Sequence, residues 1–382
     1  MLRNLYLQQI NQGFNLHPVV VMLGPRQCGK TTLARQFLAE KIAEGRETHY
    51  FDLEDPTDFT LFTNPKSILE PLHGLIIIDE VQHIADLFKL IRVLVDQNNN
   101  KRQFLILGSA SYELSRQTSE TLAGRVHFLE INPFRYMEVK DLRNLWLRGG
   151  YPRSFLANNY SDSCEWREQY IRTFLERDIP LLGIAIDFHQ MRRFWMMLTH
   201  YHGQIVNMSD LSRSLNITQP TVKRYLDLLE FTFMIRQLSP WHENLSKRQV
   251  KANKIYFRDP GIFHSLLEIN AENAILKHPK LGASWEGFAL EEIIRYHQAR
   301  NSTAFFWGTH SGAEIDLLIK QNGQTLGFEF KFQDAPIVTK SMRVALADLK
   351  LDQLTIIYPG NRNLKLEDRI DLVGLELYLL EC

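Results

Sequence analysis

The chain has 382 residues, 45% hydrophobic and 23% charged, which is the composition of an ordinary soluble protein of two or three domains. Lys plus Arg and Asp plus Glu both number 44, which excludes a uniformly basic surface, so any affinity for nucleic acid requires a local patch. The cysteines have neither the spacing of a metal site nor that of a disulfide framework. No apolar run approaches the roughly 20 residues of a membrane span. We therefore expect a cytoplasmic protein without a signal peptide or a membrane partner.

A glycine-rich loop lies between a short apolar strand at 17–23 and a segment at 32–38 with apolar residues at helical spacing. The loop reads GPRQCGKT, and its place between strand and helix identifies a P-loop rather than a chance turn. Its glycines let successive backbone N–H groups point at phosphate oxygens. The predicted ATP-contacting residues are Gly24, Pro25, Arg26, Gln27, Cys28, Gly29, Lys30, Thr31 and Thr32.

Two residues of the loop have specific expected roles. Lys30 is expected to reach the β- and γ-phosphates, and the Thr31 hydroxyl is expected to bind Mg²⁺. The apolar run 74–78 then ends in Asp79 and Glu80, two carboxylates of which the first would hold Mg²⁺ and the second would orient and deprotonate the attacking water. The alternative is a buried strand that ends by chance in surface acids.

A further apolar run at 103–108 ends in Ser109, whose hydroxyl is a candidate γ-phosphate sensor, with Ser111 as the alternative. The strands predicted at 18–23, 48–53, 75–79 and 104–108 alternate with helices. This alternation predicts an α/β fold with a doubly wound, mainly parallel sheet whose ligand site lies at the carboxyl ends of the strands.

These motifs, with LGSAS at 107–111 and LAGRV at 122–126, resemble the AAA+ family. More narrowly, the chain is similar to prokaryotic AAA+ ATPases that carry an uncharacterised, DUF4143-type C-terminal region related to restriction endonucleases. NPF at 132–134, RGGYP at 148–152 and LERDI at 175–179 match the same family. The resemblance implies ATP hydrolysis with an AAA+ core over 1–140 and a helical lid and linker over 141–192.

The resemblance also implies an arginine that contacts the γ-phosphate, often from a neighbouring subunit. Arg125 is the first candidate and Arg177 the second; each could instead pair with a nearby carboxylate. A homo-oligomer would fit this arrangement.

Residues 193–258 are predicted to form a winged-helix domain. Asn216 marks the turn between two short helices, and Thr218 caps the second, as in a helix-turn-helix. Segment 243–258 has five basic residues, Lys247, Arg248, Lys251, Lys254 and Arg258, against the acidic Glu243. With the helix-turn-helix, this segment would form a basic stripe that contacts DNA phosphates. The residues expected to contact DNA are Gln219, Thr221, Lys223, Arg224, Lys247, Arg248 and Lys251. Two alternatives stay open: a winged helix that serves as scaffold, and a basic loop that is only solvated.

Residues 259–382 are predicted to form a restriction-endonuclease-like α/β domain. Three strands joined by tight glycine turns carry Asp316 on the second and Glu329 and Lys331 on the third, with period two placing the acid and the amine on one face. This region resembles PD-(D/E)xK nucleases, although Ile315 replaces their leading proline. The resemblance implies a divalent metal held by Asp316, Glu329 and an upstream acid, for which Glu286 is the best match.

The predicted function is a Mg²⁺-dependent ATPase that binds DNA and cleaves it through the C-terminal site. The alternative is an ATP-dependent switch or regulator whose nuclease-like domain is an inactive docking module. A sequence-specific transcription regulator without cleavage is a third interpretation.

Overall fold

The computed structural model describes residues 1–84, 86–97, 102–109, 120–182, 186–242 and 251–380. Contacts along the backbone divide the chain into two compact units. The first comprises Met1–Pro133 with Phe231–Phe233, and the second Phe134–Glu230 with Met234–Cys382. Among the described helices, none combines the length and apolarity needed to cross a membrane.

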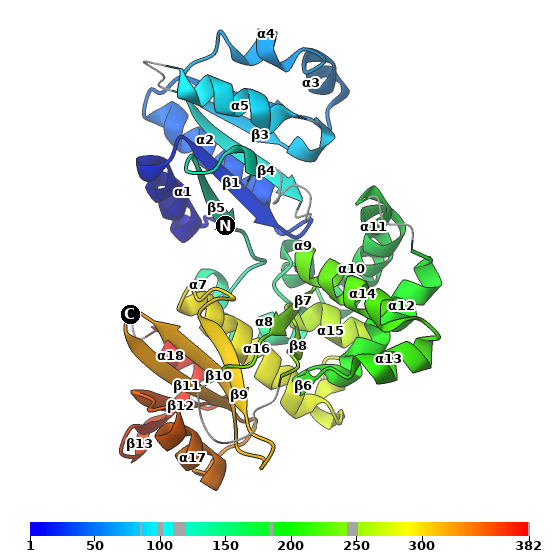
Figure 1. Ribbon diagram of the computed structural model, residues 1–382, viewed down its shortest axis with the longest axis vertical. Helices are drawn as coiled ribbons and strands as arrows, with labels where there is room; N and C mark the ends of the chain where they lie inside the picture. Colours follow the sequence, from blue (N-terminus) through cyan, green and yellow to red (C-terminus); the bar gives the residue numbers. More distant parts are fainter. Residues whose placement is uncertain (85, 98–101, 110–119, 183–185, 243–250, 381–382) are drawn as a thin grey trace. The chain divides into compact units, whose positions relative to one another are not determined.

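The first unit is built on a parallel sheet whose described strands run in the order β2-β3-β4-β1-β5 (Figure 1). Chain order and spatial order differ, so the connections cross over the sheet as in doubly wound folds. Its elements are α1 (Asn4–Leu16), β1 (Val19–Gly24), α2 (Lys30–Ala43), β2 (Thr48–Asp52), α3 (Pro56–Leu61), α4 (Pro65–Leu69), β3 (Leu75–Asp79), η1 (Val81–His83), α5 (Leu87–Asp96), β4 (Gln103–Ser109) and β5 (Val126–Glu130).

The central strands β1, β3 and β4 are buried on both faces, which explains their uninterrupted apolar sequences. Val19 and Val21 of β1 pack into one core with α5, whereas the alternate residues Val20 and Met22 pack into a second core with α1 and α2. Helices therefore cover each face of the sheet (Figure 1). The carboxyl ends of the strands remain as the edge where loops can form a site.

The second unit begins with helices and a small antiparallel sheet of order β6-β8-β7. Its helical core contains Trp195 of α12, Leu211 of α13, and Val222 and Leu229 of α14. The elements are α7 (Tyr136–Val139), α8 (Leu142–Arg148), α9 (Pro152–Phe155), α10 (Tyr160–Thr173), η2 (Phe174–Asp178), α11 (Ile179–Leu181), α12 (Phe188–Leu198), η3 (Thr199–Tyr201), β6 (Gln204–Ile205), α13 (Met208–Leu215), α14 (Gln219–Phe231), β7 (Ile235–Leu238), β8 (Lys254–Phe257) and α15 (Pro260–Leu266).

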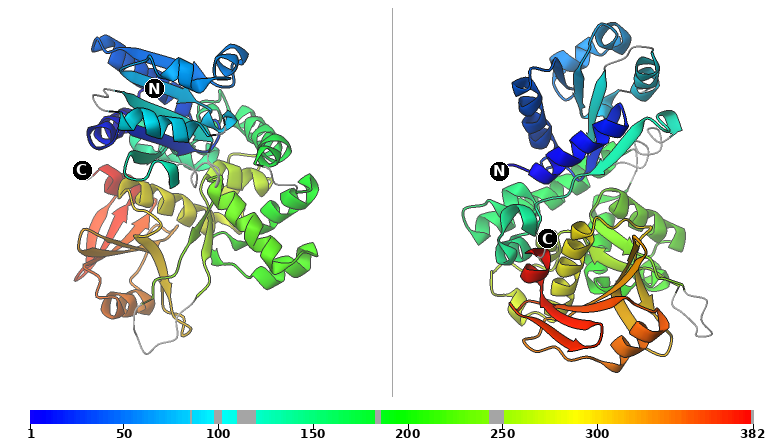
Figure 2. Two further views of the ribbon diagram at one scale, coloured as in Figure 1. Left: turned by 45° about the horizontal axis from the view of Figure 1, so that its top comes forward. Right: turned by 90° about the vertical axis from the view of Figure 1, so that its left-hand side faces the viewer.

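A mixed sheet of order β13-β14-β12-β11-β10-β9 follows in the same unit. Its strands are the yellow-orange to red arrows of Figure 2. Trp285 and Phe288 of α16 pack on one face with α18, and Met342 and Ala345 of α17 pack on the other. The elements are η4 (Ile275–Lys277), α16 (Leu281–Tyr296), β9 (Ala304–Gly308), β10 (Glu314–Gln321), β11 (Gln324–Phe330), α17 (Lys340–Asp348), β12 (Gln353–Tyr358), β13 (Asn363–Glu367), β14 (Ile370–Gly374) and α18 (Leu375–Leu380).

The predicted fold class, an α/β P-loop core with a separate C-terminal α/β domain, is confirmed. Helix α1, strand β5 and the three strands after residue 350 were not predicted from the sequence.

Candidate functional site

The predicted P-loop connects β1 to α2 at the carboxyl edge of the parallel sheet. Gly29 and Gln27 have φ values of 96° and 59°, the left-handed region that turns the loop back on itself. A Cβ atom at Gly24 would lie 2.1 Å from the carbonyl oxygen of Ile131, so only glycine fits there. The loop is thus held in a curled form against the end of β5.

Lys30 is the first residue of α2 and is only 5% exposed. Its ammonium donates to the carbonyl oxygens of Gly24 (3.0 Å) and Pro25 (2.9 Å), so the lysine folds back over the loop. Cys28 is also buried, and its thiol contacts the Ile131 carbonyl oxygen at 3.4 Å. Around these residues, Arg26 forms an ion pair of 3.8 Å with Glu54, while Gln27 and Thr32 are exposed.

Asp79 ends β3 and is buried, with 2% exposure. Tyr50 from the neighbouring β2 donates its hydroxyl to Asp79 Oδ2 at 3.0 Å, and the backbone N–H of Glu80 donates to Oδ1 at 3.0 Å. Burial raises the pKa of Asp79, while hydrogen bonds from Thr31 and Tyr50 oppose that rise. Thr31 and Asp79, predicted as Mg²⁺ ligands 48 positions apart, are therefore near enough for the Thr31 hydroxyl to lower the pKa of Asp79.

Glu80 follows Asp79 in a left-handed conformation with φ 54°, and its carboxylate accepts a hydrogen bond from Gln82. Ser109 ends β4 directly opposite Gly24 in the parallel register, so its backbone lies beside the start of the P-loop. The alternative, Ser111, lies outside the described residues. The P-loop, the two acids and Ser109 thus meet at one sheet edge.

Arg125, the first candidate for the γ-phosphate arginine, lies away from the P-loop of its own chain. It immediately precedes β5, and its carbonyl oxygen accepts from Val19 N, so it lies at the amino edge of the sheet, about 16–20 Å of strand away from the P-loop. Its guanidinium forms a two-point ion pair with Asp96 at 2.5 and 2.9 Å. Arg125 therefore does not reach the P-loop of its own chain. Arg177, in the π-helical segment η2 of the second unit, is exposed.

A second cluster of charged side chains lies in the C-terminal sheet. Leu317 of β10 pairs with Phe328 of β11, so Asp316 and Glu329 occupy neighbouring positions on the two strands. Lys331 Nζ lies 2.7 Å from Glu329 Oε2 and 3.8 Å from Asp316 Oδ2. The structure therefore brings together the three residues predicted for this site.

The buried carboxylates of the cluster have strongly altered acidity. Burial, with the charge of Asp316 in addition, raises the pKa of Glu286 and of Glu329 to about 8 each. Glu286, on α16, accepts a hydrogen bond from the hydroxyl of Tyr256 at 2.7 Å. In the part of the chain that the structure describes, no group of three His, Cys, Asp or Glu side chains could hold a metal ion. The metal role of Glu286, Asp316 and Glu329 thus stays a prediction.

The predicted DNA-contacting residues fall on α14 and on the segment that follows β7. Gln219, Lys223 and Arg224 are exposed and Thr221 is partly buried, with Thr221 N donating to Thr218 at 3.3 Å. Lys251 is exposed as well, while Lys247 and Arg248 lie outside the described residues.

The basic stripe predicted over 243–258 is wrong for two of its members. Lys254 and Arg258 are 4% and 7% exposed, so neither faces solvent. Lys254 lies 3.5 Å from Asp316, and Arg258 lies 3.6 Å from Glu291. The sequence showed their charge, but the face that each presents depends on the pairing of β8 with its neighbours.

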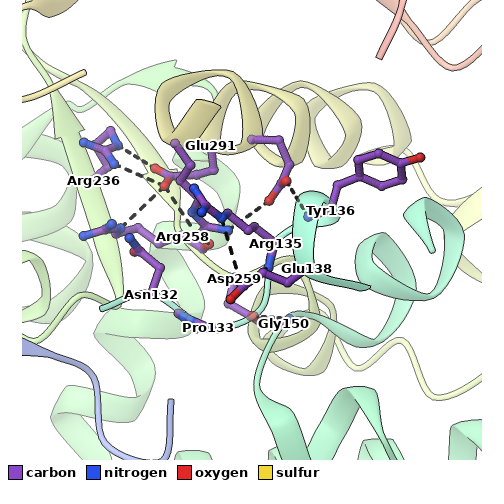
Figure 3. Close-up of polar contacts among 12 residues, drawn as sticks. Asn132, Pro133, Arg135, Tyr136, Glu138, Gly150, Arg236, Arg258, Asp259 and Glu291 are labelled. Atoms are coloured by element: carbon purple, nitrogen blue, oxygen red, sulfur yellow. Dashed lines mark hydrogen bonds and ion pairs between the residues drawn. The ribbon is translucent and has the colours of Figure 1, made fainter. Parts of the chain in front are cut away.

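Arg258 belongs to a buried ionic network around Glu291 on α16 (Figure 3). Glu291 accepts from Arg236 at 2.5 and 3.1 Å and lies 3.7 Å from Arg295. Although burial opposes ionisation, these guanidinium groups lower the pKa of Glu291 to about 2. The adjacent Glu292 accepts from the backbone N–H of Tyr136 at 2.8 Å, so α16 is tied to α7 as well as to β7 and β8.

Comparison with known proteins divides the chain into three matched regions. Residues 16–140 match a family described as an AAA domain, 139–273 a domain of unknown function (DUF8612), and 281–378 a domain of unknown function (DUF4143). Two uncharacterized proteins, from Mycobacterium tuberculosis and Mycobacterium bovis, are each 44% identical over 373 residues, covering 97% of this chain and 83% of theirs. A Walker-type ATPase of Pyrococcus abyssi is similar in structure with a TM-score of 0.46 and 15% identity, over 68% of this chain and 94% of that one.

Proposed function

Because the chain belongs to the family of AAA-domain proteins that carry a C-terminal DUF4143 domain, we propose that it binds ATP with Mg²⁺ and hydrolyses it. The observation that carries this proposal is the meeting of Lys30, Asp79 and Glu80 at one edge of the parallel sheet. That edge is where doubly wound folds bind their ligands.

Each residue at this edge has a role in the proposed reaction. The P-loop N–H groups cradle the phosphates, and Lys30 exchanges the carbonyl oxygens of Gly24 and Pro25 for phosphate oxygens. Thr31 and Asp79 fit a Mg²⁺ site, because the hard cation prefers oxygen donors and these two are near enough to interact. When bound, Mg²⁺ neutralises charge on the β- and γ-phosphates. Glu80 accepts the proton of the attacking water.

Two variants test this proposal. Lys30→Ala should lose ATP binding, and Glu80→Gln should bind ATP at the parental affinity but turn it over at least about 100-fold more slowly, the usual contribution of a general base. Binding is measured with a fluorescent ATP analogue and turnover by phosphate release. Wild-type turnover by Glu80→Gln would show that Glu80 is not the base.

DNA contact is the second part of the proposed function. It is supported by Lys223 and Arg224, two exposed basic residues on α14 after the helix-turn-helix turn at Asn216. Such residues would contact phosphates and position the duplex without reading a base sequence. Because Lys254 and Arg258 are buried, they are left out of the proposed DNA interface, which comprises α14 and Lys251.

For the C-terminal cluster two candidate functions remain. Metal-dependent DNA cleavage is favoured by the convergence of Asp316, Glu329 and Lys331. An inactive docking module of an ATP-dependent switch is favoured by the ion pairs that already occupy those carboxylates. Incubation of DNA with Mg²⁺ or Mn²⁺ separates them: cleavage that Asp316→Ala abolishes supports the nuclease, and absence of cleavage supports the docking module.

A homo-oligomer would allow Arg125, which lies away from the P-loop of its own chain, to reach the γ-phosphate of a neighbouring copy, and Arg177 is the second candidate for this role. Mixing Arg125→Ala with Glu80→Gln chains tests the first: recovered turnover in the mixture requires a site shared between copies. Turnover of Arg125→Ala alone at the parental rate would exclude Arg125.

A further inference from the structure

A lysine from outside the matched DUF4143 region lies in the C-terminal carboxylate cluster. Lys254 is the first residue of β8, and its Nζ is 3.5 Å from Asp316 Oδ1 and 3.8 Å from Glu314 Oε2. Lys331 Nζ lies 3.8 Å from the other oxygen, Asp316 Oδ2. Each carboxylate oxygen of Asp316 therefore faces an ammonium group.

The position of Lys254 follows from the pleat of β8. Successive side chains on a strand point to opposite faces, so Lys254 and Tyr256 share one face while Ile255 enters the helical core. Tyr256 donates to Glu286 Oε1 at 2.7 Å. One short strand of the middle sheet thus supplies two polar contacts to the cluster.

The cluster as it stands does not fit a divalent cation. Mg²⁺ requires oxygen ligands arranged around one point at about 2.0–2.1 Å. No three acids in the described ranges are so arranged, and Asp316 Oδ2 also accepts from Phe330 N at 3.1 Å. A divalent ion beside the buried ammonium of Lys254 would add like-charge repulsion in a region of low dielectric.

A buried ammonium has to be paired, because removing it from water costs several kcal/mol. Lys254 is 4% exposed, and besides the acids its Nζ lies 5.4 Å from the centre of the Phe306 ring. Its position is therefore determined by Asp316 and not by solvent.

We propose that Lys254 is the built-in cation of this cluster: it neutralises Asp316 in place of a metal ion and joins β8 to β10. The inference rests on the docking-module candidate for the C-terminal domain and is independent of ATP hydrolysis. It assigns a role to a residue that the sequence had placed on a DNA-facing stripe.

Manganese binding tests the proposal, with Asp79→Asn as the parent chain so that the nucleotide site does not contribute. Bound Mn²⁺ is counted by electron paramagnetic resonance without nucleotide. The parent should show no binding that depends on Asp316. Lys254→Met should bind one Mn²⁺ per chain that the parent does not bind, since the like charge of Lys254 is gone. Adding Asp316→Asn should abolish the gain, and Lys340→Met, which removes an exposed lysine of α17, should produce none.

Two results would overturn the proposal. One is Mn²⁺ binding to the parent that Asp316→Asn removes, which is decisive even if Lys254→Met does not fold. The other is a folded Lys254→Met chain, verified by circular dichroism, that binds no additional Mn²⁺. If the proposed ATP hydrolysis is wrong, the Lys30→Ala and Glu80→Gln measurements will show it. The Mn²⁺-binding result will not be affected.

Discussion

The hydroxyl of Tyr50 donates a hydrogen bond to Asp79 Oδ2 across 3.0 Å, from one strand of the parallel sheet to the end of its neighbour. Glu80 N holds the other oxygen, Oδ1, at 3.0 Å. The guanidinium of Arg35 lies 5.7 Å from the centre of the Tyr50 ring. Asp79 is therefore oriented by a tyrosine that belongs neither to the P-loop nor to the acidic motif. A hydrogen-bond partner of this kind fixes the orientation of a metal-binding carboxylate and affects its affinity for the metal ion.

Tyr50→Phe should raise the Mg²⁺ concentration needed for half-maximal ATP turnover by roughly tenfold, because a hydrogen bond to a charged group contributes about 1.5–3 kcal/mol. The measurement is phosphate release against Mg²⁺ concentration. Nucleotide affinity in EDTA should be unchanged, which separates this effect from damage to the P-loop. Tyr170→Phe, which loses a hydroxyl contact to Tyr151 in the second unit, is the matched control. An unaltered Mg²⁺ requirement would contradict the positioning role.

Gly24→Ala should abolish nucleotide binding and destabilise the first unit by about 1–3 kcal/mol, the usual effect of overpacking. The new Cβ would meet the Ile131 carbonyl oxygen at 2.1 Å, and that backbone cannot move away because Ile131 N is bonded to Leu23 O at 2.7 Å. Thermal unfolding and titration with a fluorescent ATP analogue measure the two effects.

Gly282→Ala is the control for this substitution. Gly282 lies in α16 with no atom within 4 Å of an added Cβ, so alanine should stabilise the helix by up to about 1 kcal/mol. Parental nucleotide affinity in Gly24→Ala would show that the contact with Ile131 does not shape the loop.

The strand predicted at 75–79 coincides with β3, which is buried along its whole length and ends in acids. The strand predicted at 48–53 is β2 (Thr48–Asp52), an edge strand that is only partly buried and was recognised by the turn residues that follow it. The strand β5 was not recognised, since its sequence VHFLE has only Leu129 fully buried and presents no apolar run. Burial on two faces leaves a compositional signal that an edge strand lacks.

The contacts that Tyr50 and Lys254 make with acids distant in the sequence could not be predicted, because these contacts depend on which strands are neighbours. Tyr50 reaches Asp79 only because β2 pairs with β3, and nothing in the residues around Tyr50 indicates this. Lys254 and Tyr256 have the period-two spacing that could have placed them on one face. Lys254 is buried against Asp316, however, and Asp316 comes about 60 residues later in the chain.

Lys223→Ala and Arg224→Ala should each weaken binding to duplex DNA and reduce the slope of log affinity against log salt by about one, if each side chain contacts one phosphate. Both residues are exposed on α14, so the folded state should be little affected. Fluorescence anisotropy at four salt concentrations gives the slopes. Lys66→Ala removes an exposed lysine of α4 in the other unit and should leave the slope unchanged. Parental slopes for both α14 variants would show that this helix is not the DNA-binding surface.

Glu291→Gln should destabilise the second unit by about 3–5 kcal/mol, because it leaves Arg236, Arg258 and Arg295 buried without their shared anion (Figure 3). Urea unfolding followed by circular dichroism measures the loss. Glu176→Gln removes the partner of an exposed ion pair with Arg172 and should change stability by less than about 1 kcal/mol.

The ion pairs of Glu291 also predict how the stability of the second unit depends on pH. The pKa of Glu291 is lowered to about 2 in the folded chain, whereas a glutamate in an unfolded chain titrates near 4.3. A lowered folded pKa contributes stability that is present above the unfolded value and is lost as pH falls toward the folded one. The difference in unfolding free energy between parent and Glu291→Gln should therefore be constant above about pH 5 and shrink between about pH 4.5 and 2. A difference that stays constant down to pH 3 would show that Glu291 is not held as the anion, and the network would then be stabilised by hydrogen bonds rather than by charge.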